Sequence, residues 1–213
     1  MLDDGSIHNH QAAHYDEQIK KDSNDYLREN YLEILNRVII LSDLKKGMKV
    51  LDIGVGTGLL TERLPKDLSN FGIDISEKML IKTKEKNLPI KLKKGSFLNI
   101  PFANNEFHRI ISTFAFHHLS PVEKEKAFIE MDRVLLENGI IVIGDFMFKD
   151  ENQKEKVINK FKKENRTDML LEIEDEYFTN ISRTETFLHK LNYTVIYERA
   201  SVLTWIIKAK KSS

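Results

Sequence analysis

The chain has 213 residues, of which 41% are hydrophobic and 31% are charged, so it carries enough apolar material for one sizeable core. Its 33 lysines and arginines balance 33 aspartates and glutamates, so the chain has no net positive charge that would attract nucleic acid or an anionic membrane surface. The lack of cysteine excludes disulfides, thiolate nucleophiles and cysteine-bound metal centres. No apolar signal segment or bilayer-length apolar run occurs, so we expect a cytoplasmic protein.

Apolar runs and helical stripes alternate from the start of the chain. An amphipathic helix is predicted over Asp25 to Leu41. A strand from Lys49 to Ile53 then leads through a glycine turn into a short helix, Leu59 to Leu64, which Pro65 stops. Further strands are predicted at Phe71 to Ile75, Ile90 to Lys94 and Arg109 to Thr113, with Ser76 as the N-cap of an intervening helix.

The second half begins with the clearest helix signal. Ser120-Pro121-Val122-Glu123 joins a capping box to a proline at the first helical position, and Gly139 is predicted as the left-handed C-terminal cap. A buried strand follows at Ile140 to Gly144, and residues 152 to 192 are predicted to be mostly helical, with a second capping box starting at Ser182. Two final strands, Tyr193 to Arg199 and Val202 to Lys208, are predicted to pair antiparallel.

This alternation predicts an α/β protein with a Rossmann-like, doubly wound, mostly parallel seven-stranded sheet whose last strand is antiparallel. Ligands of such sheets bind at the carboxyl ends of the strands. We expect one domain over residues 1–213, divided into an N-terminal helical cap or lid (1–46), a cofactor-binding core (47–148), a helical substrate-side insert (149–192) and a terminal strand pair (193–213).

Three glycines at alternate positions carry the main functional signal. Gly54, Gly56 and Gly58 follow a predicted strand directly, whereas a dinucleotide-binding fingerprint would need its third glycine at the position of Leu59. A GxGxG turn instead lets the backbone approach a nucleoside and an amino-acid tail closely. Asp74, at the end of the next strand, can accept hydrogen bonds from both ribose hydroxyls. Taken singly, the glycines only make a tight turn and Asp74 only caps a helix; their joint occurrence favours a cofactor site.

These motifs resemble the class I S-adenosylmethionine-dependent methyltransferases, and within them the small bacterial methyltransferase-domain branches eleven and twenty-five. The resemblance extends over nearly the whole chain, through VLDIGVGTGLLT, GIDISEKML, GSFLNIPF, STFAFHHL and LLENGIIVIGD. It implies that the protein is an enzyme with S-adenosyl-L-methionine as its cofactor. The segment from EDEYFT onward resembles an uncharacterised subgroup with presumed roles in small-molecule metabolism.

The resemblance also implies roles for individual residues. The three glycines would line the methionine part of the cofactor, with Asp52 at its ammonium group and Asp74 at its ribose. Around the adenine and the sulfonium it would place Ile75, Met79, Ser96, Phe97, Thr113, Phe114 and His118. Many relatives have aspartate where this chain has Ser96, so the contact to the adenine amino group would be weaker or bridged by water. Tyr15 would lie over the cofactor as part of a lid.

Methyl transfer from a sulfonium is an in-line displacement, which requires alignment of the acceptor and exclusion of water. A phenol, thiol or protonated amine acceptor also needs a base, for which His118 and then His117 are the candidates; alternatively, the two histidines only pack. Tyr15, Phe114 and Phe116 are candidates for an aromatic wall around the cationic cofactor, although Phe116 fits an ordinary core position equally well. Glu176 and Tyr177 would favour a cationic or amine-bearing acceptor if they turn inward.

We expect no metal site. His10 and His14 have helical spacing, but no carboxylate pattern beyond Asp16 and Glu17 supports the histidines of the N-terminus as ligands. Metal-dependent catechol-type relatives need acids near the fourth strand, where this chain has Ser112 and Thr113. The lysines between Lys78 and Lys94 lack an aromatic platform, so no nucleic-acid partner is expected.

The sequence therefore predicts an enzyme that methylates an O, N or S atom of a small-molecule metabolite, working as a monomer or homodimer without a membrane partner. Two alternatives remain open. One is a non-catalytic regulatory protein that binds S-adenosylmethionine, and the other is a nicotinamide-dependent oxidoreductase, against which the glycine spacing argues.

Overall fold

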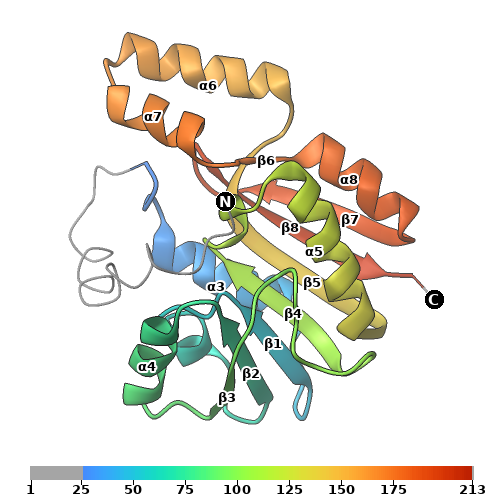
Figure 1. Cartoon of the computed structure of the whole chain (residues 1–213). Helices are drawn as coiled ribbons and strands as arrows, with labels where there is room; N and C mark the ends of the chain where they lie inside the picture. The colour runs from blue at the N-terminus through green and yellow to red at the C-terminus, as the bar shows by residue number, and fades with distance from the viewer. Residues whose placement is uncertain (1–25, 213) are drawn as a thin grey trace.

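The computed structural model describes residues 26–212, and its strands form a single twisted sheet (Figure 1). The order of neighbouring strands is β3-β2-β1-β4-β5-β8-β7, with the short β6 paired to the end of β5. Pairing is parallel from β3 through to β5, whereas β8 runs antiparallel to both β5 and β7. The predicted fold class, a mostly parallel sheet with its last strand antiparallel, is thereby confirmed.

The strands span β1 Lys49–Ile53, β2 Ser69–Asp74, β3 Ile90–Lys94, β4 Phe107–Thr113, β5 Leu135–Phe148, β6 Thr179–Asn180, β7 Tyr193–Arg199 and β8 Thr204–Lys211. Strands β1, β4 and β5 occupy the centre of the sheet and are buried over almost their whole length, because helices cover both of their faces. This explains why they consist of nearly unbroken apolar runs.

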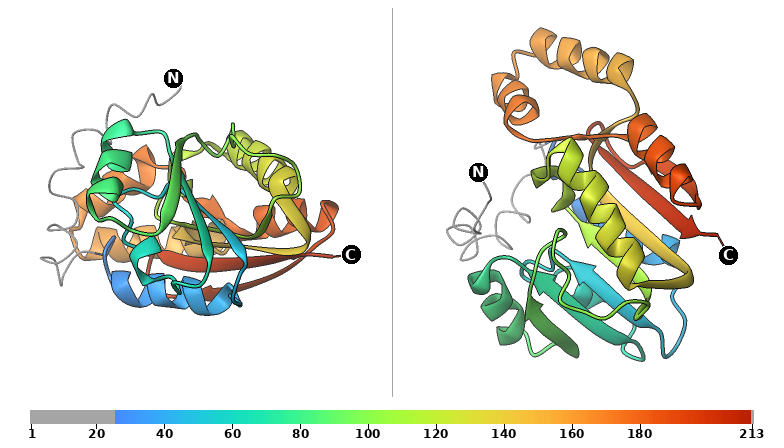
Figure 2. Two further views of the ribbon diagram at one scale, coloured as in Figure 1. Left: turned by 90° about the horizontal axis from the view of Figure 1, so that it is seen from below. Right: turned by 45° about the vertical axis from the view of Figure 1, so that its right-hand side comes forward.

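Helices on opposite faces of the sheet supply two separate cores (Figure 2). On one face lies α3 (Tyr31–Leu41), whose buried Ile34, Leu35 and Val38 pack on β4, β5 and β8. On the other lie α5 (Pro121–Val134) and α8 (Ile181–Lys190). The helix α4 (Glu77–Glu85) follows β2 and packs against β2 and β3.

The helices α6 (Glu151–Lys163) and α7 (Thr167–Asp175) extend beyond the carboxyl end of β5 (Figure 1). They enclose a third apolar cluster, in which Phe161 and Ile173 pack with Phe146 and Phe148 of β5. The chain then returns through β6 to α8. This helical excursion from the sheet, residues 151–180, brings residues near position 176 to the carboxyl edge of the sheet, where ligands of such folds bind.

Local sequence signals explain several helix boundaries. Ser76 accepts a hydrogen bond from the Met79 amide at 3.2 Å and caps α4 as predicted. Both halves of the capping box formed by Ser120 and Glu123 are present at the start of α5. In both cases the two partners lie within three residues of each other.

Four other predicted boundaries are wrong. The first helix begins at Tyr31 rather than near residue 25, because Asn30 takes a left-handed conformation with φ of 58°. Residue 25 itself lies outside the described residues. The predicted helix over Leu59 to Leu64 is only a 3₁₀ turn, η1 (Thr61–Arg63). Pro65 ends the segment after too few residues for a full α-helix.

The remaining two errors concern caps. Asn138, with φ of 60°, is the left-handed residue near the end of α5, and Gly139 lies inside β5, where an added Cβ would collide with the Leu135 side chain. The N-cap of α8 is Asn180, which accepts from the Arg183 amide at 3.0 Å, whereas the Ser182 hydroxyl donates to the Lys149 carbonyl. The C-cap of α5 is Leu135 in an extended conformation, so no left-handed residue caps this helix, whereas at α8 Asn180 takes the N-cap position instead of Ser182.

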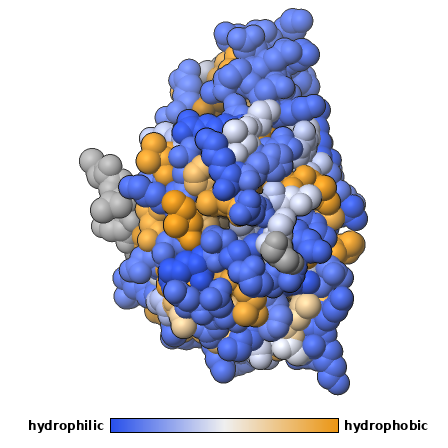
Figure 3. Space-filling view, turned by 90° about the vertical axis from the view of Figure 1, so that its right-hand side faces the viewer, coloured by the Kyte–Doolittle hydropathy of each residue, from blue (hydrophilic) through white to orange (hydrophobic). Residues whose placement is uncertain are grey.

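Hydrophilic side chains predominate on the side of the molecule shown in Figure 3, where hydrophobic ones form separate groups. Within residues 26–212, no helix has the length and apolar character required to cross a bilayer.

Candidate active site

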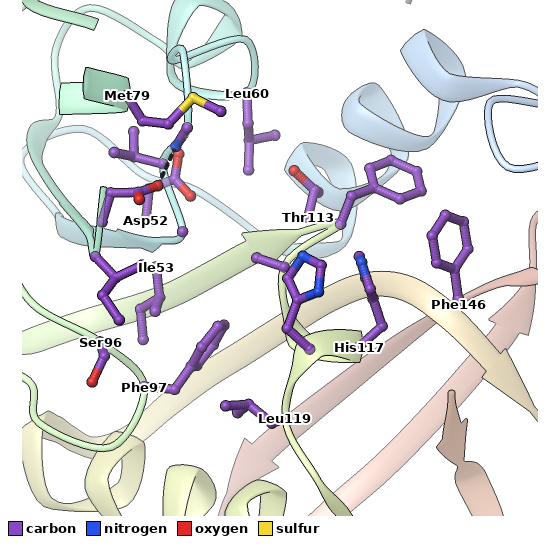
Figure 4. A pocket seen from close by; sticks show the side chains of 18 of the residues that line it. Asp52, Ile53, Leu60, Met79, Ser96, Phe97, Thr113, His117, Leu119 and Phe146 are labelled. Atoms are coloured by element: carbon purple, nitrogen blue, oxygen red, sulfur yellow. Dashed lines mark hydrogen bonds between the residues drawn. The ribbon is translucent and has the colours of Figure 1, made fainter. Parts of the chain in front are cut away.

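A cavity of about 630 Å³ opens at the carboxyl ends of β1, β2 and β4, a volume typical of small-molecule sites. Asp52 and Met79 lie on one side of it, and His117 and Phe146 on the other (Figure 4). The predicted site residues that line it are Asp52, Gly54, Gly56, Asp74, Ile75, Met79, Ser96, Phe97, Thr113, Phe114, His117 and His118. Tyr15 lies outside the described residues.

The glycine turn after β1 forms the floor of the cavity. Gly54 has φ of 72°, and an added Cβ would lie 2.5 Å from the Ala115 Cβ, so only glycine fits there without displacement. Gly56 has φ of 54° and leaves open space where a Cβ would be. Gly58 departs from its predicted role: it does not line the cavity, and an added Cβ would meet Thr83 of α4 at 2.9 Å. It permits close packing of the turn against α4.

Asp74, at the end of β2, ties this turn to the start of α4. Its Oδ2 accepts a hydrogen bond from the Gly56 amide at 2.9 Å, and its Oδ1 accepts from the Ser76 amide at 2.8 Å. The residue is 8% exposed and lines the cavity. Each carboxylate oxygen has two lone pairs, so backbone donation leaves capacity for further donors on a ligand.

Asp52 lies near the end of β1 and is buried at the base of the cavity. The Thr61 hydroxyl donates to its Oδ2 at 2.8 Å. Burial raises the pKa of Asp52 to about 7; the Thr61 hydrogen bond opposes this shift and the charge of Asp74 adds to it. A cation beside the carboxylate would favour its ionised form, so this corner is suited to a positively charged group.

The far end of the cavity is formed by the residues after β2 and β3. Met79 and Phe97 are buried, with 4% and 6% of their surfaces exposed, and Ile75 lines the cavity with them. The loop after β3 is closed by a mutual pair of backbone hydrogen bonds between Ser96 and Asn99, each of 3.2 Å. The Ser96 hydroxyl accepts from the Leu98 amide at 3.3 Å, which holds this loop in a fixed turn.

Phe114 follows β4 in a strained backbone conformation. Its φ of 51° is a genuine outlier for a bulky side chain, and such strain is maintained where the surroundings determine it. The ring stacks on Tyr31 of α3, with centroids 4.5 Å apart, and contacts Phe146 of β5. Phe116, by contrast, is fully buried among Phe97 and Phe128 and is a core residue.

His117 lies in η2 (Phe116–His118) beside a buried carboxylate that sequence reasoning did not identify as a site residue. Its Nδ1 is 2.6 Å from Oδ1 of Asp145, which is inaccessible to solvent within β5. Oδ2 of Asp145 accepts from the backbone amides of residues 115, 116 and 117. Although burial acts to raise the pKa of Asp145, His117, the Phe146 amide and the charge of Lys124 hold it below its ordinary value.

Because Asp145 is ionised, it acts only as an acceptor, and the His117 Nδ1 must therefore carry the proton that it donates. Nε2 is then the ring nitrogen that Asp145 does not engage. The carboxylate thus fixes the orientation of the imidazole.

His118 has its own carboxylate partner from the helical excursion. Its Nδ1 lies 3.1 Å from Oε2 of Glu176, just after α7. Burial tends to raise the pKa of Glu176, but the hydrogen bond and charge of His118 make its net shift downward. Glu176 turns inward and lines the cavity, as the hypothesis of a cationic acceptor required. Its carboxylate, however, already contacts His118. Tyr177 also lines the cavity while remaining half exposed.

Lys124 of α5 joins the excursion to the histidine loop, which is the segment of residues 116–119 that carries His117 and His118. Its Nζ donates to the carbonyls of Leu119 and Tyr177, and burial lowers its pKa to about 8. The Tyr177 amide in turn donates to the His117 carbonyl at 3.0 Å. These bonds fix Glu176 next to His118.

Comparisons with known proteins agree with this geometry. Residues 50–139 match the family model described as a methyltransferase domain. An uncharacterised methyltransferase of Alkaliphilus oremlandii is 33% identical over 99% of both chains, and one of Oceanobacillus iheyensis is 34% identical over 94% of this chain and 93% of its own. The chain belongs to the class I methyltransferases. The resemblance seen in the sequence is thereby confirmed.

A solved structure of similar fold is described as a putative S-adenosylmethionine-dependent methyltransferase from Methanococcus maripaludis. It is 22% identical, has a TM-score of 0.68 and covers 96% of this chain and 94% of its own. The fold of this methyltransferase is therefore similar to that solved structure over almost its whole length.

Proposed function

We propose that this methyltransferase transfers the methyl group of S-adenosylmethionine to an O, N or S atom of a small-molecule metabolite. The observation that carries the proposal is the pair of carboxylates, Asp52 and Asp74, on either side of an open glycine turn within one cavity. Such a cavity can receive an amino-acid tail and a nucleoside together.

The chemistry of the cavity suits each part of this cofactor. The ammonium group of its methionine part would stabilise the ionised form of Asp52, whose burial otherwise opposes ionisation. The ribose hydroxyls would donate to Asp74, which already has the correct orientation through two backbone amides. The adenine would lie between Ile75, Met79 and the loop at Ser96 and Phe97.

The sulfonium end would then face Thr113, Phe114 and the two histidines. An aromatic ring near a sulfonium is favourable because the negative face of the ring attracts a cation. The restrained rings of Phe114 and Phe146 also exclude water from the transfer path. In-line displacement needs little else from the protein than alignment of the acceptor, the methyl group and the sulfur.

For an acceptor that must lose a proton, we propose His117 or His118 as the proton acceptor. His117 is the better oriented of the two, because buried Asp145 holds its Nδ1 and leaves Nε2 as the nitrogen that would take the proton. This reverses the order expected from the sequence, in which His118 came first. The Asp145 and His117 pair has the arrangement in which a carboxylate orients a basic imidazole.

Binding of S-adenosylhomocysteine tests the cofactor assignment without knowledge of the acceptor. We expect it to raise the Tm of the protein in a thermal-shift titration, with NAD giving no shift. Asp74→Ala is expected to lose most of this affinity, because the ribose hydroxyls would lose a charged acceptor. Asp67→Ala, which changes an exposed aspartate outside the cavity, is the matched control.

Stabilisation by NAD alone would contradict the proposal and favour an oxidoreductase. Binding of S-adenosylhomocysteine without turnover of S-adenosylmethionine across a broad panel of phenols, thiols and amines would favour a regulatory protein instead.

A further inference from the structure

Three potential metal ligands converge in the part of the cavity lined by η2 and by the residue after α7. His117 and His118 come from η2, and Glu176 comes from the residue after α7, 58 positions beyond His118. One ligand atom from each side chain lies within 4.8 Å of the others. All three residues line the same cavity, so the space beside them is open to a ligand.

Hydrogen bonds outside this trio orient its members. Asp145 accepts from one nitrogen of His117 and leaves the other for coordination, and metal-bound histidines are commonly oriented by a carboxylate in this way. The Tyr177 amide bound to the His117 carbonyl fixes the backbone of Glu176 relative to the histidine loop. The ligand-bearing segments are therefore held together before any ion binds.

The sequence led us to expect no metal site; from the structure we propose that His117, His118 and Glu176 bind one divalent transition-metal ion, of the class that includes Zn²⁺ and Co²⁺. Two imidazoles and one carboxylate form a recognised ligand set for these ions, and they leave at least one coordination position for a water molecule or a substrate atom. In this protein that position would face the cavity.

Geometry and charge both permit the ion. Ligand atoms about 2.1 Å from a tetrahedral zinc lie about 3.4 Å apart, so no pair needs to approach by more than about 1.4 Å. His118 and Glu176 can make this movement because 30% and 27% of their side chains are exposed. The carboxylates of Asp145 and Glu176 outnumber the nearby ammonium of Lys124, so the surroundings favour an added cation.

The inference rests on the proposed function in one respect, the role of the ion. A metal ion here would hold the acceptor and lower the pKa of a coordinated hydroxyl or thiol. The histidine nitrogens would then bind the ion instead of taking a proton. The acceptor class favoured by this arrangement is a molecule with a hydroxyl, thiol or imidazole group that can coordinate a divalent ion.

Titration with Co²⁺ tests the binding directly, because its visible absorption reports the number and type of its ligands. The full chain is used with His8, His10 and His14 each replaced by glutamine, which removes the other clustered histidines as competing ligands. We expect one Co²⁺ per chain, displaced by Zn²⁺. Glu176→Gln and, separately, His118→Asn are expected to weaken binding at least about tenfold. Glu174→Gln, an exposed change two residues away, should leave it unchanged.

The proposal is overturned if no one-to-one complex forms below about 100 µM Co²⁺. It is equally overturned if Glu176→Gln binds as tightly as the parent. S-adenosylhomocysteine binding, measured on the same preparations, keeps the two proposals apart. Cobalt binding without S-adenosylhomocysteine binding would uphold the metal site and reject the proposed cofactor. S-adenosylhomocysteine binding without cobalt binding would uphold the cofactor and reject the metal site.

Discussion

Replacing Asp52 by asparagine should stabilise the protein at alkaline pH. Burial raises the pKa of Asp52 from 3.8 to about 7, so the folded protein holds a proton there that the unfolded chain releases. Stability is therefore full below the unfolded pKa and is lost as the pH rises through 7. A difference of about three pKa units corresponds to about 4 kcal/mol at pH 8. Asparagine keeps the size of the side chain and can still accept from Thr61, but it carries no charge.

Urea unfolding of the ligand-free protein measures this effect. Trp205, the single tryptophan, is 9% exposed in β8 and provides the fluorescence signal. Between pH 5 and pH 8 the wild type should lose about 3 kcal/mol relative to Asp52→Asn. Asp67→Asn, at an exposed position, should follow the wild type. The reasoning is refuted if the difference in unfolding free energy between Asp52→Asn and the wild type is no larger at pH 8 than at pH 5.

The same substitution should weaken S-adenosylhomocysteine binding, since the ammonium group loses its carboxylate. In the wild type, affinity should fall about tenfold for each pH unit below 7, because each unit makes ionisation of Asp52 cost about 1.4 kcal/mol more. Isothermal titration between pH 5 and pH 8 measures this slope. In Asp52→Asn the slope should be absent; an unchanged slope would mean that another group titrates on binding.

Three further substitutions test the scaffold. Asp145→Asn should cost about 3–5 kcal/mol in urea unfolding, because several buried donors lose their charged acceptor; a loss below 1 kcal/mol would contradict this assignment. Gly54→Ala should lower both the Tm and S-adenosylhomocysteine affinity. Gly47→Ala, with a similar positive φ but no atom near the added Cβ, should cost only about 1 kcal/mol; equal losses would exclude the steric explanation. Ser120→Ala should destabilise α5 by about 1 kcal/mol, and no change would mean that its capping bond contributes nothing.

Features encoded by neighbouring residues could be predicted from the sequence. The N-caps Ser76 and Ser120 act on residues three positions ahead, and the glycine turn follows its strand directly. Strand positions were predictable because each central strand is buried on both faces and therefore apolar along its length. A cap prediction failed where two candidates lie within a few residues of each other, as at Asn180 and Ser182.

His117, His118 and Glu176 were candidates from the sequence, but their contacts could not be predicted, because these join distant parts of the chain. Asp145 looked like an interruption of an apolar strand, and only the parallel pairing of β4 with β5, which aligns Thr113 with Gly144, brings it to the amides of η2. Glu176 reaches His118 through the packing of α7 on the end of β5. Neither contact has a local pattern, although a lone aspartate in a buried strand is itself a signal of bound donors.

The two ends of the cavity therefore differ in how they are built. At the proposed cofactor end, the carboxylate of Asp74 is held by two backbone amides, those of Gly56 and Ser76. The histidine side depends on side chains that the excursion brings against the histidine loop, with Lys124 as the connecting cation. Substitutions in α7 and the segment after it can consequently alter this side of the cavity while the hydrogen bonds of Asp52 and Asp74 stay in place. If the proposed function holds, we expect changes in this segment to alter the choice of acceptor more than the binding of the cofactor.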